Sequence, residues 1–353
     1  MKDATNIEAG FSCPLPIAEY KRILLAHGGG GKLTHDLVQQ MFAPKFKNKF
    51  LEPFHDGAVF SVEKSRLAFT TDSYVINPIF FPGGDIGKLS ICGTINDLAM
   101  CGARSLFLSS AFIIEEGLPV EELWKIVCSM EQIMNESGVQ LVTGDTKVVD
   151  KGKGDKIFIT TSGIGIVPEG VDINPKRATP GDQIILSGSI AEHGIAIMSV
   201  RQGLEFDTQI VSDCAPLHQL VATMIEASNE IHVLRDPTRG GVATVLNEIA
   251  DSSKVGISIS EKNIPISEEV KGACEILGFD PLYVANEGKL ISFVPPQAVE
   301  KVLTAMRSHP LGTNSTLIGE VTSEHPGTVV MKTRIGSSRI VDMLSGEQLP
   351  RIC

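Results

Sequence analysis

The sequence predicts a two-domain α/β protein, and three observations support this fold class. The chain has 353 residues, of which 42% are hydrophobic, which is enough for about two buried cores at roughly 150 residues per domain. Segments with strand-like alternation and segments with helical spacing follow one another along the chain. Three prolines, Pro168, Pro175 and Pro180, interrupt this pattern within a polar stretch, which is therefore the expected domain boundary.

The first half of the sequence predicts a domain at residues 22–168. Residues 1–21 contain acids and prolines and are expected to form an extension. A short apolar run then leads through glycines into a helical pattern in "KRILLAHGGGGKLTHDLVQQMF". Strands are predicted for "GAVFSV", "RLAFTTDSYVI", "QLVTG" and "KIFITTSGIGIV", and helices for "GKLSICGTINDLAMCGA" and "PVEELWKIVCSMEQIMNESG".

The second half predicts another domain at residues 169–342, followed by a tail. The final segment, "LSGEQLPRIC", contains Gly346 and Pro350 and has no periodicity, so residues 343–353 are expected to be flexible. From Ser345 to Cys353 the extended chain reaches about 30 Å at roughly 3.3 Å per residue. The terminal thiol can therefore enter a cleft or leave it.

Composition and charge exclude several classes of protein. The net charge is −11, from 31 basic and 42 acidic side chains, which argues against a nucleic-acid partner held by phosphate contacts. No apolar run reaches the roughly 18 residues of a membrane span, and the first residues do not resemble a signal peptide, so a cytoplasmic protein is expected. The seven cysteines have no paired spacing that indicates disulfides or zinc. Packing in a core explains most of them, but not the terminal Cys353.

The glycine loop "HGGGGK" is the first candidate binding site. Four consecutive glycines let backbone N–H groups turn toward an anion such as phosphate. Neither common nucleotide motif fits, because Ala26 and Leu33 stand where a P-loop needs glycine and a hydroxyl, and Leu33 also breaks a dinucleotide fingerprint. A glycine hinge is the structural alternative. The candidate residues are Gly28, Gly29, Gly30, Gly31 and Lys32.

Four aspartates form the second candidate site. Asp56, Asp72, Asp97 and Asp145 each lie at the end or on the inward side of an apolar element. Asp97 shares one helical face with apolar and small residues, so its carboxylate needs a partner. Hard oxygen ligands of this kind suit Mg²⁺, which binds carboxylates together with substrate phosphates. Each aspartate taken singly is equally typical of a turn or a helix cap.

A helix start in "DPTRGGVATVLNEIA" is the third candidate. Asp236 suits an N-cap and Pro237 the first helical position, and Arg239 with two glycines lies at the helix mouth. Such a helix start can receive an anion. A capped structural helix fits the same residues equally well.

The short motif "NEGK" supplies the last candidates, Glu287 and Lys289. They are either a general base beside a cation or a surface pair worth less than about 1 kcal/mol. Their spacing alone favours the surface pair.

These motifs together resemble a known family. The segments "HGGGGK", "TTDSYVINPIFFPGGDIGKLSICGTINDLAMCGA", "VTGDTKVV", "DPTRGG", "ANEGKL" and the terminal "PRIC" are similar to the HypE family of hydrogenase maturation factors, the carbamoyl dehydratases, over roughly residues 22–353. That family belongs to the aminoimidazole ribonucleotide synthetase-like (PurM-like) superfamily, with selenophosphate synthetase and thiamine-monophosphate kinase. These relatives share the aspartates and glycines, so only "PRIC" is specific to the dehydratases.

The resemblance implies an architecture, a reaction and partners. An N-terminal domain would bind ATP and Mg²⁺ and form a homodimer, and a C-terminal α/β domain would precede the flexible tail. ATP-dependent dehydration would convert an S-carboxamide on the last cysteine to a thiocyanate, the source of cyanide for the iron of [NiFe] hydrogenase. A HypF-type carbamoyltransferase would load the cysteine, and a HypC–HypD-type scaffold complex would accept the cyanide.

The resemblance also assigns roles to residues. Cys353 would be the carrier. For the reaction that the resemblance implies, our hypothesis takes Glu287 as the base, because a carboxylate near the tail accepts a proton when burial raises its pKa, and Lys289 and Arg239 as the groups that stabilise the departing phosphate. The metal ligands would be Asp56, Asp72, Asp97 and Asp145. The nucleotide would contact Gly28, Gly29, Gly30, Gly31, Lys32, Asp72, Asp97, Thr146, Lys147 and Asp236.

Three other functions stay open at this stage. A selenophosphate synthetase needs a cysteine or selenocysteine in the glycine loop, and residues 28–31 contain none. A thiamine-monophosphate kinase explains the aspartates but has no use for a terminal cysteine. A non-catalytic carrier or scaffold would present the tail to a partner without consuming ATP.

Overall fold

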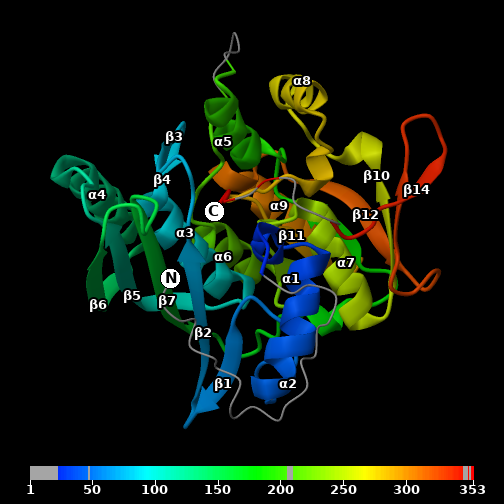
Figure 1. Ribbon diagram of the computed structural model, residues 1–353. Coiled ribbons are helices and arrows are strands. Elements are labelled where there is room, and N and C mark those ends of the chain that lie inside the picture. The colour runs from blue at the N-terminus through cyan, green and yellow to red at the C-terminus, as the bar shows by residue number, and fades with distance from the viewer. Residues whose placement is uncertain (1–22, 47, 205–209, 345–348, 350) are drawn as a thin grey trace, which may run out of the picture.

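The computed structural model describes residues 23–46, 48–204, 210–344, 349 and 351–353. Its described strands form a five-stranded sheet, a seven-stranded sheet and a small two-stranded sheet. The two large sheets lie on either side of the proline-rich stretch in the sequence, since β7 ends at Val167 and β8 begins at Gln183. Helices pack on both, and the C-terminus lies near the middle of the molecule (Figure 1).

The five-stranded sheet is built from the first half of the chain. All of its neighbouring strands are antiparallel except β5 and β6, which are parallel and are joined across α4, as a parallel pair requires. In sheet order its strands are β1 (Ala58–Val62), β2 (Ser65–Tyr74), β7 (Ile157–Val167), β5 (Arg104–Glu115) and β6 (Gln140–Val149).

Two helices follow this sheet, α3 (Ile86–Met100) and α4 (Val120–Ser137). The Asp85 carboxylate caps α3 by accepting the N–H groups of Gly87 and Lys88. α4 ends at Gly138, whose φ of 65° is the left-handed geometry that glycine permits at a helix end. Nearly every residue of α3 is buried, including the apolar and small residues that share a helical face with Asp97.

The seven-stranded sheet is built from the second half and is mostly antiparallel. Its strands in sheet order are β14 (Ser338–Ile340), β13 (Val329–Lys332), β10 (Gly256–Ser260), β12 (Thr316–Thr322), β8 (Gln183–Leu186), β11 (Ile291–Val294) and β9 (Val233–Arg235). Its helices are α5 (Glu192–Gln202), α6 (His218–Ala227), α7 (Gly241–Ser253), α8 (Glu268–Leu277) and α9 (Val299–Ser308).

The two halves share a hydrophobic core. Side chains of α5, α7 and α8 form one core on one face of the seven-stranded sheet. Side chains of α6 and α9 pack on the opposite face, and Leu98, Ala99 and Met100 of α3 join that same core. A third core contains α3 and α4 and also Ile352 and Cys353. The C-terminal end of α3 and the last two residues of the chain are therefore packed against side chains from both halves.

Short elements complete the fold. α1 (Lys32–Leu37), a π-helical turn at Val38–Phe42 and α2 (Ala43–Phe46) form one continuous helical segment beside the sheets (Figure 1). The two-stranded sheet pairs β3 (Phe80–Phe81) with β4 (Gly84–Asp85). Every helix and strand proposed above for residues 32–167 is present, and the structure adds β5. No helix among the described residues is long and apolar enough to cross a bilayer.

Candidate active site

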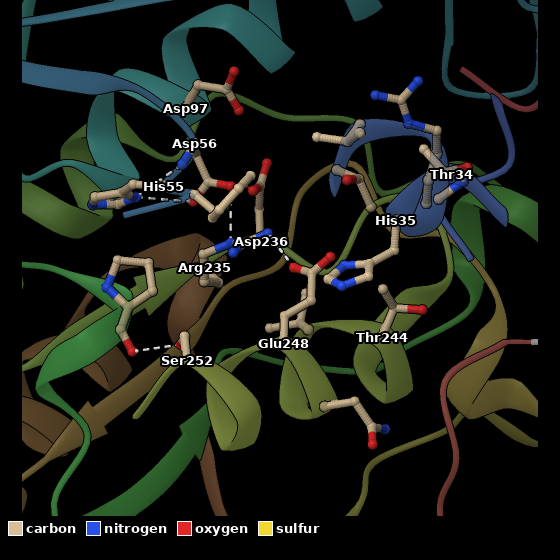
Figure 2. A pocket seen from close by; sticks show the side chains of 18 of the residues that line it. Thr34, His35, His55, Asp56, Asp97, Arg235, Asp236, Thr244, Glu248 and Ser252 are labelled. Carbon is tan, nitrogen blue, oxygen red and sulfur yellow. Dashed lines mark hydrogen bonds and ion pairs between the residues drawn. The ribbon is translucent and has the colours of Figure 1, made fainter. Parts of the chain in front are cut away.

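A cavity of about 910 Å³ is lined by residues from both halves of the chain. α1, β2 and α3 contribute from the first half, and the end of β9, most of the length of α7 and the loop at Glu287 contribute from the second. Figure 2 shows Asp56, Asp97 and Asp236 gathered on one side of this pocket, with α7 residues along its floor. The last residue, Cys353, is also part of the lining.

Three carboxylates of this cavity form a compact cluster. Oxygen atoms of Asp56, Asp97 and Asp236 lie within 4.8 Å of one another. Arg235 Nε is 2.8 Å from Asp56 Oδ1 and its Nη2 is 2.9 Å from Glu248 Oε2, so it neutralises one side of the cluster. The Thr70 hydroxyl donates to Asp97 Oδ2 at 2.7 Å. The cluster thus contains three carboxylates, but few positively charged or hydrogen-bond-donating groups among the described residues contact it.

The cluster has the electrostatic character of a cation site. Burial, and then the charge of Asp56, raises the pKa of Asp236 to about 7. Burial, and then the charges of Asp236 and Asp72, raises the pKa of Asp97 well above its ordinary value. At Asp56 the nearby Arg235 and His55 outweigh burial, so its pKa is lowered. Oxygen ligands that repel one another in this way fit a divalent cation such as Mg²⁺.

The end of the chain is docked in the cavity. The N–H of Val75 donates to Cys353 O at 3.2 Å, and the N–H of Asn77 donates to Arg351 O at 3.3 Å, so the last residues pair with the segment that follows β2. Cys353 is only 9% exposed. Burial raises the pKa of its thiol to about 12 although Arg239 acts in the opposite direction. The docked thiol is therefore neutral and shielded, whereas the sequence suggested an exposed one.

Glu287 lies in the same cavity on a rigid loop. It is 3% exposed, and its Oε1 has no hydrogen-bond partner among the described residues. Its backbone N–H and that of Gly288 each donate to the Asp213 carboxylate at 3.1 Å, and Asn96 Nδ2 donates to Glu287 O at 3.3 Å. Burial, and then nearby Cys214 and acidic groups, raises the pKa of Glu287 well above its usual range.

Arg239 is a cation that interacts with both Cys353 and Glu287. Its Nη2 lies 3.7 Å from Asp72 Oδ1. Interaction with the thiolate form of Cys353, and then with Asp72, raises the pKa of Arg239 against the opposing effect of burial. Gly30 packs directly on Arg239, where a Cβ atom would collide with it. This close approach explains one glycine of the glycine loop.

Two expectations about these motifs are wrong. Asp236 is not an N-cap, because α7 begins at Gly241 with Gly240 as its N-cap and the intervening residues form a turn. The motif "NEGK" is not a surface pair, because Glu287 is buried and Lys289 Nζ instead lies 3.0 Å from Glu192 Oε2 and 3.7 Å from Asp213 Oδ2.

The structure brings together most of the predicted site residues. The predicted residues that line the cavity are Gly28, Gly30, Asp56, Asp72, Asp97, Asp236, Arg239, Glu287 and Cys353. The predicted residues outside its lining are Gly29, Gly31, Lys32, Asp145, Thr146, Lys147 and Lys289. Lys32 is exposed at the start of α1, and residues 145–147 lie on the exposed strand β6, where Lys147 Nζ contacts the Asp145 carboxylate at 2.8 Å.

Three residues that line the cavity or contact the docked tail were not predicted from the sequence. Arg235 sits directly before the predicted Asp236 and neutralises Asp56. Tyr74 ends β2 and turns its buried ring into the cavity, against Gly93 of α3. His193 on α5 contacts the docked tail. Arg235 adjoins a motif, and Tyr74 lies within one, two residues after Asp72, so both could have been found, whereas His193 has no local signal.

Comparison with known proteins gives the class. Residues 54–167 match the family described as AIR synthase related protein, N-terminal domain, and residues 179–332 match its C-terminal domain. The carbamoyl dehydratase HypE of Cupriavidus necator is 51% identical over 349 residues, which is 99% of each chain. A crystal structure of HypE in complex with ATP is 46% identical, covers 94% of this chain and all of that one, and has a TM-score of 0.80.

A second solved structure, a HypE–HypF complex, is 50% identical with a TM-score of 0.83 and covers 87% of this chain and 99% of that one. The fold and the two domain matches define an AIR synthase related, PurM-like protein. Within that class, the identity over nearly the whole length is decisive: the chain belongs to the carbamoyl dehydratase HypE family.

Proposed function

We propose that this protein is an ATP-dependent carbamoyl dehydratase that converts an S-carboxamide on Cys353 to a thiocyanate and so supplies cyanide for the iron of [NiFe] hydrogenase. One observation supports this most strongly. The last residue of the chain is seated in the same cavity as a buried carboxylate, Glu287, and the cluster of three aspartates. A carrier thiol, a base and a cation site therefore meet in one place.

The chemistry needs each of these groups. An amide oxygen is a poor leaving group, so the γ-phosphoryl of ATP is first transferred to the carboxamide oxygen, with release of ADP. The nitrogen then loses its two protons while the C–O bond to phosphate breaks, which leaves S–C≡N and inorganic phosphate. Glu287, when ionised, is the base that accepts a proton from nitrogen, and Arg239 faces the developing negative charge beside Cys353.

The cavity also fits the nucleotide and its metal. A related HypE has been solved with ATP, and in this chain the glycines at 28 and 30 border the cavity that holds the carboxylates. Asp56, Asp97 and Asp236 would hold Mg²⁺, with Asp72 beside them. When bound, Mg²⁺ supplies charge neutralisation between carboxylates and phosphates. Lys289 holds the Glu287 loop through Asp213 and in this proposal acts from outside the cavity.

A homodimer would complete the site. Asp145 pairs in register with Ala111, Ala111 with Thr160 and Thr160 with Ser73, so Asp145 lies on the sheet face that also exposes Phe69 and Phe107. That face opposes α3 and presents large apolar groups to solvent, which is typical of a protein interface. A second copy packed here would bring Asp145, Thr146 and Lys147 of one chain toward the nucleotide of the other.

The partners and location follow the same reasoning. A HypE–HypF complex is known for a relative, and in this protein a HypF-type carbamoyltransferase would load Cys353 when the tail is released. A HypC–HypD-type scaffold complex would then take the cyanide. In this proposal the protein acts in the cytoplasm, together with these partners. The terminal cysteine inside the cavity leaves the kinase and selenophosphate alternatives without an explanation for it.

Mass spectrometry of the C-terminal peptide tests the proposal. The protein is carbamoylated at Cys353 and incubated with and without ATP and Mg²⁺. We expect an ATP-dependent loss of one water mass from that peptide. Persistence of the carboxamide under conditions in which ATP is hydrolysed would show that the protein is a carrier rather than a dehydratase.

A further inference from the structure

A buried histidine contacts the backbone of the docked tail. His193 of α5 is fully buried, and its Nε2 lies 2.8 Å from the carbonyl oxygen of Ile352. Its Nδ1 lies 2.8 Å from Ser212 Oγ, which also accepts the N–H of Cys214 at 3.1 Å. Because the Ile352 carbonyl oxygen can only accept, the hydrogen of a neutral ring must lie on Nε2, and Nδ1 then accepts from the Ser212 hydroxyl. This chain of contacts selects the tautomer that carries its hydrogen on Nε2 and donates it to Ile352.

The surroundings keep this histidine neutral. Burial lowers the pKa of His193, against the opposing effect of Asp213. The edge of the His193 ring packs against Phe81 at a centroid distance of 5.5 Å and an interplanar angle of 89°. A neutral ring held on two sides offers one fixed donor. Its orientation is therefore set before the tail arrives.

Other contacts to the tail also go to its backbone. The Arg201 guanidinium, about two helical turns beyond His193 on α5, donates to the carbonyl oxygens of Arg351 and Asn77. Together with the N–H groups of Val75 and Asn77, these donors engage every carbonyl from Arg351 to Cys353. Contacts of this kind fix where the chain end lies along the groove, whatever its side chains are.

The same short segment also holds the base. Ser212 orients His193, and the next residue, Asp213, accepts the N–H groups of Glu287 and Gly288. Asp213 has a fully buried side chain and lies 3.7 Å from Lys289 Nζ. Two consecutive residues thus connect the tail on one side with the Glu287 loop on the other.

We propose that His193 is a positioning residue that sets the register of the last three residues, and that Ser212 and Asp213 align the group on Cys353 with Glu287. This inference rests on the proposed function, because alignment matters only if chemistry takes place on Cys353. Proton transfer needs the reacting atoms within hydrogen-bond reach, and a displacement of about 1 Å costs on the order of 100-fold in rate.

Two measurements on the full-length protein test it. The first is the rate at which iodoacetamide alkylates unmodified Cys353, followed on the C-terminal peptide, which reports how often the tail leaves the cavity. The second is the single-turnover rate of ATP-dependent water loss from the carbamoylated protein. The variants are His193→Leu, His193→Gln and Ser212→Ala, and the matched control is Ser199→Ala, whose hydroxyl donates within α5 to Ile195 O.

We expect His193→Leu to raise alkylation about tenfold, the effect of losing one hydrogen bond of roughly 1.4 kcal/mol, and to slow water loss by about 10- to 100-fold. His193→Gln retains a donor at a similar reach and should recover much of both rates. Ser212→Ala should raise alkylation by a smaller factor, and Ser199→Ala should match the wild type.

The outcomes separate the two proposals. Alkylation and water loss within twofold of wild type in a folded His193→Leu variant would overturn the positioning role. Should that variant fail to fold, Ser212→Ala decides: unchanged alkylation overturns the role and increased alkylation supports it. If the wild type loses no water with ATP, the proposed function is wrong, while the alkylation series still reports whether His193 holds the tail.

Discussion

The predicted site residues lie in two regions, the inner cavity and the open strand β6. The two regions differ in the contacts that their site residues make within one chain. In the cavity, Asp56, Asp97 and Asp236 are fixed by contacts within one chain. On β6, Asp145 and Lys147 contact mainly each other and are exposed on an open sheet face. The cavity residues should therefore act within a single chain. Asp145 and Lys147 would act only if a second chain packs against β6.

The largest effect is expected at the end of the tail. Cys353→Ala removes the atom that carries the carboxamide, so thiocyanate formation should be lost completely while the fold is kept, because the side chain is small and terminal. Mass spectrometry of the C-terminal peptide measures the product. Cys128→Ala, on α4 and away from the cavity, is the matched control and should retain full conversion. Product formation in Cys353→Ala would mean that another group carries the substrate.

A smaller effect is expected at the base. Glu287→Gln keeps the size of the side chain but cannot accept a proton, so water loss should slow by about 100-fold or more. Because burial raises the pKa of Glu287 above its ordinary 4.5, the wild-type rate should increase as pH rises through that raised pKa, since only the ionised form is a base. Rapid-quench measurements from pH 5 to 9 would reveal this. A Gln variant with the wild-type rate and pH profile would exclude the role.

The open sheet face that carries Asp145 offers the direct test of the comparison. Phe107, 42% exposed on that face, should tolerate lysine within one chain, but Phe107→Lys should weaken association of two chains. Analytical ultracentrifugation should show a shift toward monomer together with a fall in ATP turnover. Ile276→Lys on α8 is the control, since Ile276 is 70% exposed on another part of the molecule. If Phe107→Lys leaves both association and turnover unchanged, this sheet face is not an interface.

The local elements could be predicted because their signals are local. α3, α4 and the strands around them follow from periodicity and from caps such as Asp85 and Gly138. β5 was not singled out, because its long apolar run lacks clean alternation. Periodicity did not show that α3 is also covered on its other sides, because that burial depends on elements far away in sequence.

The sequence identified many of the site residues, but it did not predict how these residues are arranged in space. Asp56, Asp97 and Glu287 stand in motifs, but sequence spacing could not tell that Asp236 would join the first two. His193 lies in "AEHGIA", which has no recognisable motif, and its partner Ile352 is 159 residues away. Contacts of this kind form when the two halves of the chain pack together. Local patterns in a single sequence do not predict them.

The smallest expected effect concerns the cation site and separates the cavity from β6 once more. Without a divalent cation, ionisation of Asp236 is less favourable in the folded protein, because its pKa of about 7 lies above its ordinary 3.8. The folded state then binds more protons than the unfolded state between these values, so the free energy of unfolding should fall as pH rises from about 4 to 7, by at most about 4 kcal/mol from this group.

Mg²⁺ should offset this loss of stability, raising the melting temperature by several degrees at pH 8 and little at pH 5. Differential scanning calorimetry at the two pH values measures this, with Asp236→Asn expected to remove most of the Mg²⁺ effect and Asp145→Asn, on β6, expected to leave it in place. Equal effects of the two substitutions would mean that the cavity cluster alone does not hold the cation.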